Sequence, residues 1–186
     1  DIPPFPCCTV APGNTLAVEH VTFGYTEEPL FSDLNFKAKA GDIIGITGEV
    51  ACGKTTLGKL FLNVLPYQGS ITLNGKPLAE YKERTVSYLG HDPQLFSSTI
   101  GENISLGDEI DFDEILKEVC LDEEIKEFDQ GLDTVIGDHG VRMSGGQQER
   151  IALARALAHP APIILLDDPF SAVDPQTEGK ILHDLR

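Results

Sequence analysis

A glycine-rich stretch at residues 48–56 constrains the fold of this chain more than any other feature. It matches the pattern G-x-x-x-x-G-K-[ST] and reads Gly48-Glu49-Val50-Ala51-Cys52-Gly53-Lys54-Thr55-Thr56. The apolar run 42–47 predicts a buried strand before it, and the apolar spacing of 57–64 predicts a helix after it. Between a strand and a helix, the loop N–H groups converge on one anion and the helix dipole adds to the attraction. The stretch therefore predicts a phosphate-binding loop, with a chance glycine-rich turn as the alternative.

Three side chains then have expected roles at a nucleotide. In this pattern Lys54 reaches the β- and γ-phosphates and assists catalysis, and the Thr55 hydroxyl ligates Mg²⁺. A second apolar run, 163–166, predicts a buried strand that ends at Asp167. A carboxylate at the end of such a strand is typical of a residue that orients Mg²⁺ and its waters. The alternative for Asp167 is a strand-terminating turn.

The composition limits the classes of function. The chain has 186 residues, of which 41% are hydrophobic, so we expect one sizeable core in one or two subdomains. Its 14 lysines and arginines against 30 aspartates and glutamates give a net charge of −16, which argues against a nucleic-acid partner. No run approaches the ~20 apolar residues of a membrane span, and the acidic, proline-rich start predicts no signal peptide. We expect reduced, intracellular cysteines without metal spacing at Cys7, Cys8, Cys52 and Cys120.

The first half of the chain is predicted to be mainly β-structure around the phosphate loop. Residues 1–14 carry prolines at positions 3, 4, 6 and 12, which predicts an extended linker or tail rather than a core element. The pair Asn74-Gly75 is a strong hairpin signal. Apolar patterning predicts short strands at 16–23, 30–36, 70–73 and 86–89.

The second half is predicted to be mainly helical and acidic between residues 97 and 150. Positions 108–129 hold eleven acidic residues against two lysines, which favours a solvated helical face over an acidic binding site. Asp111, three residues before Glu114, reads as a helix start. Asp174-Pro175 predicts the start of a last helix, with aspartate as the N-cap and proline at the first helical position.

The segment Ser144-Gly145-Gly146-Gln147 has the chemistry of a second anion site. Ser144 is a good N-cap, and Gln147 stands three residues later, as a capping box requires. Together with the phosphate loop and Asp167, the segment makes residues 16–186 resemble an ABC-type ATPase domain. The resemblance implies an α/β fold: a P-loop NTPase core with a mixed sheet, an antiparallel β subdomain and an inserted α-helical subdomain that carries this signature. It divides the chain into a tail 1–14, a core 15–96 with 159–186, and a helical subdomain 97–158.

The same resemblance implies the ligands and the partners. ATP and Mg²⁺ are the expected cofactors, and Tyr25 resembles the aromatic residue that stacks on adenine, with an ordinary strand-end tyrosine as the alternative. The signature closes over the γ-phosphate held by a second ABC ATPase domain in a head-to-tail dimer, and residues 171–174 cross that interface. The expected phosphate contacts are Gly48, Ala51, Cys52, Gly53, Lys54, Thr55 and Thr56 on one domain and Ser144, Gly145, Gly146 and Gln147 on the other.

Two segments resemble multidrug-type exporters within the family. Residues 95–104 resemble the exporter segment after the glutamine loop, and residues 134–140 resemble the loop that touches the transmembrane domain. The resemblance therefore implies a transmembrane-domain partner and a place at the cytoplasmic face of the cell membrane.

Three positions depart from the family pattern. Asp168 replaces the glutamate that polarises the attacking water, His91 replaces the glutamine of the glutamine loop, and Ala51 replaces a frequent third glycine. Because aspartate is one methylene shorter and general-base help is worth roughly 10²–10⁴ in rate, we expect slow hydrolysis at this site. Asp168 and His91 remain the catalytic candidates beside Lys54. An altered own site with a nearly intact signature resembles one half of a heterodimer.

The family also has a further strand and a histidine after the last helix, so the chain is expected to be an excised part of a domain. His183 is not assigned that histidine's role, because it falls within the predicted helix. Two rival functions remain open. One is a non-transport ABC ATPase, although about ninety residues between Lys54 and Ser144 leave no room for long coiled coils. The other is a nucleotide-gated regulatory domain without useful turnover.

Overall fold

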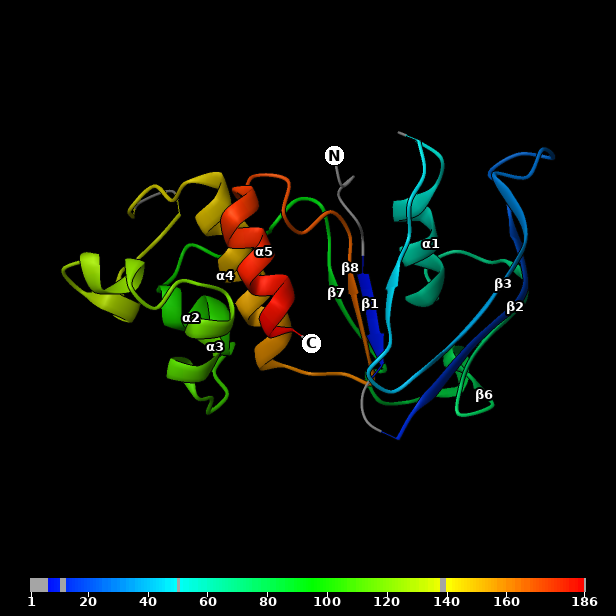
Figure 1. The fold of residues 1–186 in the computed structure, drawn as a ribbon, viewed down its shortest axis with the longest axis horizontal. Coiled ribbons are helices and arrows are strands. Elements are labelled where there is room, and N and C mark those ends of the chain that lie inside the picture. Colours follow the sequence, from blue (N-terminus) through cyan, green and yellow to red (C-terminus); the bar gives the residue numbers. More distant parts are fainter. Residues whose placement is uncertain (1–6, 11–12, 50, 138–139, 186) are drawn as a thin grey trace. The chain divides into compact units, whose positions relative to one another are not determined.

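The computed structural model describes residues 7–10, 13–49, 51–137 and 140–185, with backbone alone for residues 7–10. The chain divides into two compact units (Figure 1). Unit 1 comprises residues 1–88 and 161–167, and unit 2 comprises residues 89–160 and 168–186. The division expected from the sequence assigns residues 89–96 and 168–186, which include the last helix, to the core, whereas here they belong to unit 2.

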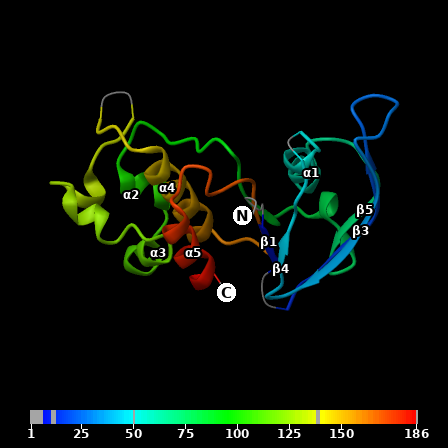
Figure 2. The same ribbon diagram turned by 45° about the horizontal axis from the view of Figure 1, so that its top comes forward.

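An antiparallel sheet forms one layer of unit 1, with strand order β3-β2-β5-β6. β2 (Thr15–Phe23) pairs with both β3 (Phe31–Lys39) and β5 (Gln68–Leu73), as the long strands in Figures 1 and 2 show. The four apolar residues that predict this strand are buried: Leu16 and Val18 and, after an irregularity in the pairing, Val21 and Phe23. The turn into β6 (Lys76–Pro77) has positive φ at Asn74 and Gly75, which confirms the predicted hairpin.

The second sheet of unit 1 has the order β4-β1-β8-β7. β4 (Ile43–Gly45), β8 (Ile163–Leu166) and β7 (Val86–Leu89) lie where the apolar runs predict strands. β1 (Cys7–Val10) pairs antiparallel with both β4 and β8. The prediction of a tail at 1–14 is therefore wrong for residues 7–10, while the prolines at 3, 4, 6 and 12 lie outside the described residues. These four residues contain no proline, and two flanking strands complete their hydrogen bonds.

α1 (Lys54–Phe61) follows the phosphate loop directly, so the helix starts three residues before the predicted 57–64 and also ends earlier. Val64 was expected on its apolar face, but it lies beyond the helix and is 64% exposed. The buried face of α1 joins the core of unit 1, formed with residues of both sheets: Leu16, Val18, Val21, Phe23, Ala38, Leu57, Leu60, Phe61, Ile71, Leu73, Leu78, Val86, Ile163 and Leu165. Leu78 belongs to the 3-10 turn η1 (Leu78–Glu80).

Unit 2 is built around α4 (Gly145–Ala158), against which α2 (Ile100–Ser105) and α3 (Phe112–Glu118) pack. The 3-10 turns η2 (Glu124–Glu127) and η3 (Gly131–Asp133) precede α4, and α5 (Pro175–Asp184) follows β8 in the chain. The predicted N-caps of α3, α4 and α5 are confirmed, since Asp111, Ser144 and Asp174 each accept from a first-turn N–H. In the described part of the chain no helix has the length and apolar character needed to cross a membrane.

Candidate functional site

The loop between β4 and α1 is closed by its own lysine. Lys54 Nζ donates to the carbonyl oxygens of Gly48 (2.9 Å) and Glu49 (2.8 Å), and lies 3.8 Å from Cys52 Sγ. The N-cap of α1 is Gly53, which offers no side-chain acceptor to the first turn. The N–H groups of that turn therefore keep the partial positive charge that attracts a phosphate. The Lys54 ammonium has three donors, so a phosphate oxygen can accept from it at the site of the long contact to Cys52 Sγ.

Two of the described residues of the loop have left-handed backbone conformations. Gly53 has φ +101°, and a Cβ there would lie 2.7 Å from Leu30 Cδ2. Ala51 has φ +66°, where a residue with a side chain is disfavoured by roughly 1–2 kcal/mol. The departure at Ala51 thus falls at a backbone conformation that glycine adopts readily.

Tyr25 lies beside the first turn of α1. Its hydroxyl is 3.2 Å from Thr56 Oγ1, and its ring meets Phe23 edge to face at a centroid distance of 4.9 Å. Tyr25 is 64% exposed, so much of its ring is accessible to a planar ligand. The structure therefore brings the expected adenine contact to the helix that carries the expected phosphate contacts.

The expected metal ligands of unit 1 are Thr55, on the exposed side of α1, and the buried Asp167 at the end of β8. The hydroxyl of Tyr88 on β7 donates to Asp167 Oδ2 at 3.1 Å. Burial, followed by the charge of Asp167, raises the pKa of Tyr88 to about 12, so the phenol stays protonated and can donate. A hydroxyl and a carboxylate are the oxygen ligands that Mg²⁺ takes beside phosphates and water, so these residues fit that ion.

In unit 2, Asp168 faces His91, which also departs from the family pattern. His91 Nδ1 lies 3.4 Å from Asp168 Oδ2. Asp168 Oδ1 is buried and has no hydrogen-bond partner among the residues that the structure describes. A buried carboxylate oxygen without a donor is costly and offers a place for water. Gln94 is the glutamine nearest to His91 in the sequence, and its amide donates to Asp92 Oδ2 at 2.9 Å.

The signature segment opens α4 with a complete capping box. Ser144 Oγ accepts from Gln147 N–H at 3.2 Å, and Gln147 Oε1 accepts from Ser144 N–H at 2.9 Å. The Gln147 amide also donates to Glu124 Oε2 at 3.0 Å, and Arg150 Nη1 donates to Glu124 Oε1 at 2.7 Å. Burial of Glu124 favours its protonated form, but the hydrogen bonds from Arg150 and Gln147 outweigh burial and lower the pKa of the carboxyl. Glu124 therefore stays charged and fixes the first turns of α4.

The segment at residues 94–96 is held firmly although its aromatic side chain is exposed. Asn103 is fully buried, and its amide accepts from Phe96 N–H and donates to the Phe96 carbonyl. Arg155 donates to the Gln94 carbonyl at 2.7 Å and lies 5.0 Å from the centroid of the Phe96 ring. Phe96 is nevertheless 57% exposed. A hollow of about 500 Å³ next to this segment is lined by Pro93, Gln94, Leu95, Ile136, Gly137, Gly140, Val141, Arg142, Met143 and Gln148.

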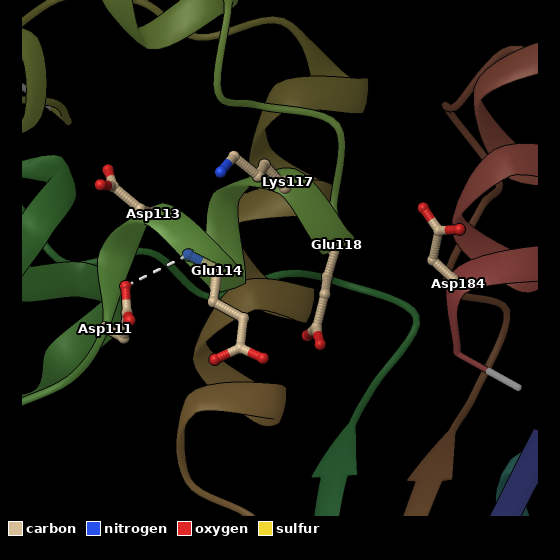
Figure 3. Close-up of a pocket in the computed structure, with 6 residues that line it drawn as sticks. All are labelled: Asp111, Asp113, Glu114, Lys117, Glu118 and Asp184. Atoms are coloured by element: carbon tan, nitrogen blue, oxygen red, sulfur yellow. Dashed lines mark hydrogen bonds between the residues drawn. The ribbon is translucent and has the colours of Figure 1, made fainter.

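Figure 3 shows a second hollow of unit 2, lined by Asp111, Asp113, Glu114, Lys117, Glu118 and Asp184. Burial and the nearby carboxylates of Glu114 and Asp184 raise the pKa of Glu118. Such a negative surface repels phosphates. Within the described ranges, no group of three or more His, Cys, Asp or Glu residues is placed to hold a metal. The hollow therefore does not favour an acidic binding site over the predicted solvated helical face.

Sequence reasoning missed the residues that support the site from a distance. Tyr88 lies 79 positions from Asp167, and Glu124 lies 26 positions from Arg150. No local pattern marks such pairs. Glu149 and Arg150 of α4 are charged side chains that the structure nearly fully buries, and the sequence analysis did not predict their burial.

Comparison with known proteins places these features in one family. The family model described as ABC transporter matches residues 31–171. A probable multidrug resistance ABC transporter ATP-binding/permease protein, YheI of Bacillus subtilis strain 168, is 37% identical over 94% of the chain and 32% of its own length. An ATP-dependent lipid A-core flippase of Alcanivorax borkumensis is 35% identical over 95% of the chain and 32% of its own length. The chain thus spans about a third of these relatives.

A solved structure of a bacterial Atm1-family ABC exporter with ATP bound has the same fold. It superposes with a TM-score of 0.81 at 29% identity, and it covers 100% of the chain and 34% of its own length. The expected fold class is therefore confirmed.

Proposed function

The chain belongs to the ABC transporter family as an exporter-type ATP-binding domain, an ATPase, and on that premise we propose that it is the ATP-driven motor domain of a membrane exporter at the cytoplasmic face of the cell membrane. The observation that carries the proposal is the phosphate loop closed by Lys54 at the uncapped start of α1. Tyr25 stacks on the adenine, Lys54 binds the β- and γ-phosphates, and the first-turn N–H groups bind the remaining phosphate oxygens.

We propose that Thr55 and Asp167 hold Mg²⁺ at these phosphates. The metal supplies charge neutralisation for the transferred phosphoryl group. Tyr88 orients Asp167 through the hydrogen bond to Oδ2, which leaves the rest of the carboxylate to face the metal and its waters. In this account the chain provides both ligands from two neighbouring elements of unit 1.

Hydrolysis at this chain's own phosphate loop is proposed to be slow. The attacking water needs a carboxylate that accepts its proton, and Asp168 reaches one methylene less far than glutamate. His91 faces one oxygen of this carboxylate, and the other oxygen is buried. These two observations also favour the second candidate function, a nucleotide-gated regulatory domain, which differs from the first only in whether this site turns over.

The signature is proposed to serve a second ATP-binding domain. Ser144, Gly145, Gly146 and Gln147 lie at the start of the longest helix of unit 2, where a capping box orders the backbone. In a head-to-tail dimer this helix start closes over the γ-phosphate of the partner domain. This chain combines an altered ATP site of its own with an ordered signature. The combination supports a heterodimer, whose partner carries glutamate at the position of Asp168.

The transmembrane domain is proposed to contact unit 2 at Phe96 and the neighbouring hollow. Three large apolar side chains, Phe96, Val135 and Val141, are 57%, 45% and 43% exposed and are therefore available to a partner. Asn103 and Arg155 hold the segment to α2 and α4, so a force on Phe96 reaches the signature helix. Of the expected loop 134–140, residues 138 and 139 lie outside the described residues.

Exchange of the base tests this function. Asp168→Glu should raise hydrolysis of the ATP bound at this chain's own phosphate loop at least tenfold in the assembled transporter, because it restores the reach of the general base. Asp168→Asn is the matched control and should lower turnover below that of the unmodified protein. If Asp168→Glu binds ATP as before but hydrolyses it no faster, the slow step depends on the partner or on another residue. A non-transport ABC ATPase would show turnover without a transmembrane partner.

A further inference from the structure

A buried glutamate of the signature helix holds the loop that follows β8. Glu149 lies in α4 and is only 5% exposed. Its Oε1 accepts a hydrogen bond from the Ser171 hydroxyl, and its Oε2 accepts from Ala172 N–H at 2.9 Å. Both oxygens of the carboxylate are therefore bound to two consecutive residues of one loop. None of the roles described above uses this buried charge.

The first turn of the same helix is shaped to receive the loop. A Cβ at Gly145 would lie 3.0 Å from Ala172 Cβ, and a Cβ at Gly146 would lie 2.7 Å from the Ala172 carbonyl oxygen. Glu149 stands four residues after Gly145, so it projects from the same side of the helix. The two glycines allow the loop to approach, and the carboxylate then binds it.

The loop is fixed at its other end as well. Asp174 accepts from the N–H groups of Gln176 and Thr177 and so caps α5. Val173 N–H donates to the Phe170 carbonyl at 3.1 Å, which closes a turn. Between these points only Glu149 supplies side-chain acceptors to the loop in the contacts that the structure describes.

The adjacent charge on α4 serves a different segment. Arg150 donates to the carbonyl oxygen of Cys120 and to Glu124, on the side of η2. Neighbouring charges of one helix turn therefore hold two separate segments, and Glu149 is the one directed at the loop 171–174.

We propose that Glu149 is a positioning residue that fixes the loop 171–174 on the signature helix. The chain then presents the signature and this loop to a second ATP-binding domain as one preformed surface. This inference rests on the proposed head-to-tail dimer. Glu149 acts through Ser171 and Ala172 and does not touch the nucleotide.

Amide hydrogen exchange of the full 186-residue chain, followed by NMR, tests the contact itself. Glu149→Ala removes both acceptors, so exchange at the Ala172 amide should accelerate at least tenfold. Glu149→Gln should stay within threefold of the unmodified chain, because the amide oxygen can accept from Ala172 and the amide nitrogen can donate to Ser171 Oγ. Val119→Ala, at a fully buried position of unit 2, is the control for general loss of stability. Equal acceleration in Glu149→Ala and Val119→Ala would overturn the proposal.

ATP turnover of the assembled transporter tests the role of the contact. Glu149→Ala should lower kcat at least tenfold with KM for ATP changed less than twofold, and Glu149→Gln should recover most of kcat. Val119→Ala should retain kcat. An unchanged kcat in Glu149→Ala, despite faster exchange at Ala172, would overturn the coupling and leave the ATPase function standing. Failure of the unmodified transporter to bind ATP would instead contradict the proposed function, and the exchange result would still decide the contact.

Discussion

At the scale of single residues, the phosphate loop depends on a few backbone and side-chain features. Lys54 ties the loop together through the carbonyls of Gly48 and Glu49. Ala51 holds a backbone angle that suits glycine, and Tyr88 supplies a hydrogen bond to Asp167. Each of these features can be altered by a small substitution.

Ala51→Gly should stabilise the chain. The left-handed conformation at Ala51 costs roughly 1–2 kcal/mol, and the entropy that glycine loses on folding offsets about 0.5–1 kcal/mol of the gain. We expect a net increase of about 0.5–1 kcal/mol in the free energy of unfolding, measured by urea denaturation. Ala79→Gly, at an exposed position of the 3-10 turn Leu78–Glu80, should instead destabilise the chain. A loss of stability in Ala51→Gly would contradict the assigned backbone strain.

Tyr88→Phe should weaken metal binding at Asp167. The substitution removes the donor to Asp167 Oδ2 and keeps the ring, and loss of such a supporting hydrogen bond typically weakens metal affinity about 10–100-fold. Mn²⁺ affinity in the presence of ATP, measured by electron paramagnetic resonance, should fall about tenfold. Tyr81→Phe removes a comparable hydrogen bond, to the Leu73 carbonyl, and should leave Mn²⁺ affinity unchanged. Equal affinities in the two variants would refute the role of Tyr88.

The residues that could be predicted from the sequence are those whose chemistry is local. The phosphate loop, the capping box of Ser144 and Gln147, and the N-cap Asp174 each lie within a few positions of their partners. The supporting residues could not be predicted, because Tyr88 and Glu149 meet partners 79 and 22 positions away. Such contacts depend on the tertiary fold and leave no spacing in the sequence.

At the scale of elements, α4 connects the segments that we assign to coupling. Its first turn carries the signature, Glu149 holds the loop 171–174, and Arg155 holds the segment at Gln94. Asn103 on α2 accepts a hydrogen bond from Phe96 N–H and so also fixes this segment. The helix therefore links the proposed membrane contact with the proposed dimer contact inside unit 2.

Ser144→Ala should destabilise unit 2 and weaken the association of two domains. Loss of an N-cap costs about 1 kcal/mol, in a range of 0.5–2. Asp111→Ala removes the cap of α3 and should cost a similar amount of stability. ATP-dependent dimerisation, measured by sedimentation, should fall only in Ser144→Ala. Equal dimerisation in both variants would show that the cap of α4 has no role at the interface.

Elements with a strong internal pattern were predictable, and elements defined by their partners were not. The alternation of β2 and the apolar run of β8 identify these strands without further information. β1 was missed because its hydrogen bonds go to β4 and β8, which lie far along the chain. Val64 extended an apolar period that the helix does not follow, since α1 ends at Phe61.

At the scale of the whole chain, the net charge of −16 makes the protonation of carboxylates important for stability. Glu124 has a lowered pKa in the folded chain, and Glu118 has a raised one. A lowered pKa adds stability above the ordinary value of 4.5, and this stability is lost as the pH falls through the folded pKa. For Glu118 the sign is opposite, because its charged form is disfavoured in the folded state.

Glu124→Gln should reduce stability at pH 7 by roughly 1 kcal/mol, the upper end for a partly exposed ion pair, and much less at pH 3. The loss should shrink as the pH falls below 4.5, where the carboxylate of the unmodified chain takes up its proton. Glu118→Gln should raise stability at pH 7. Urea midpoints at both pH values measure these changes. The assigned electrostatics would be wrong if Glu124→Gln and Glu118→Gln shifted the midpoint at pH 7 in the same direction.

We propose that this chain holds ATP at residues 48–56 and hydrolyses it slowly. The most direct measurement is calorimetric binding of Mg-ATP to the chain, with the bound nucleotide recovered and identified after an hour. We expect binding that Lys54→Ala weakens at least tenfold, with the nucleotide recovered as intact ATP. Recovery as ADP would contradict the slow site at Asp168, and absence of binding would contradict the phosphate loop itself.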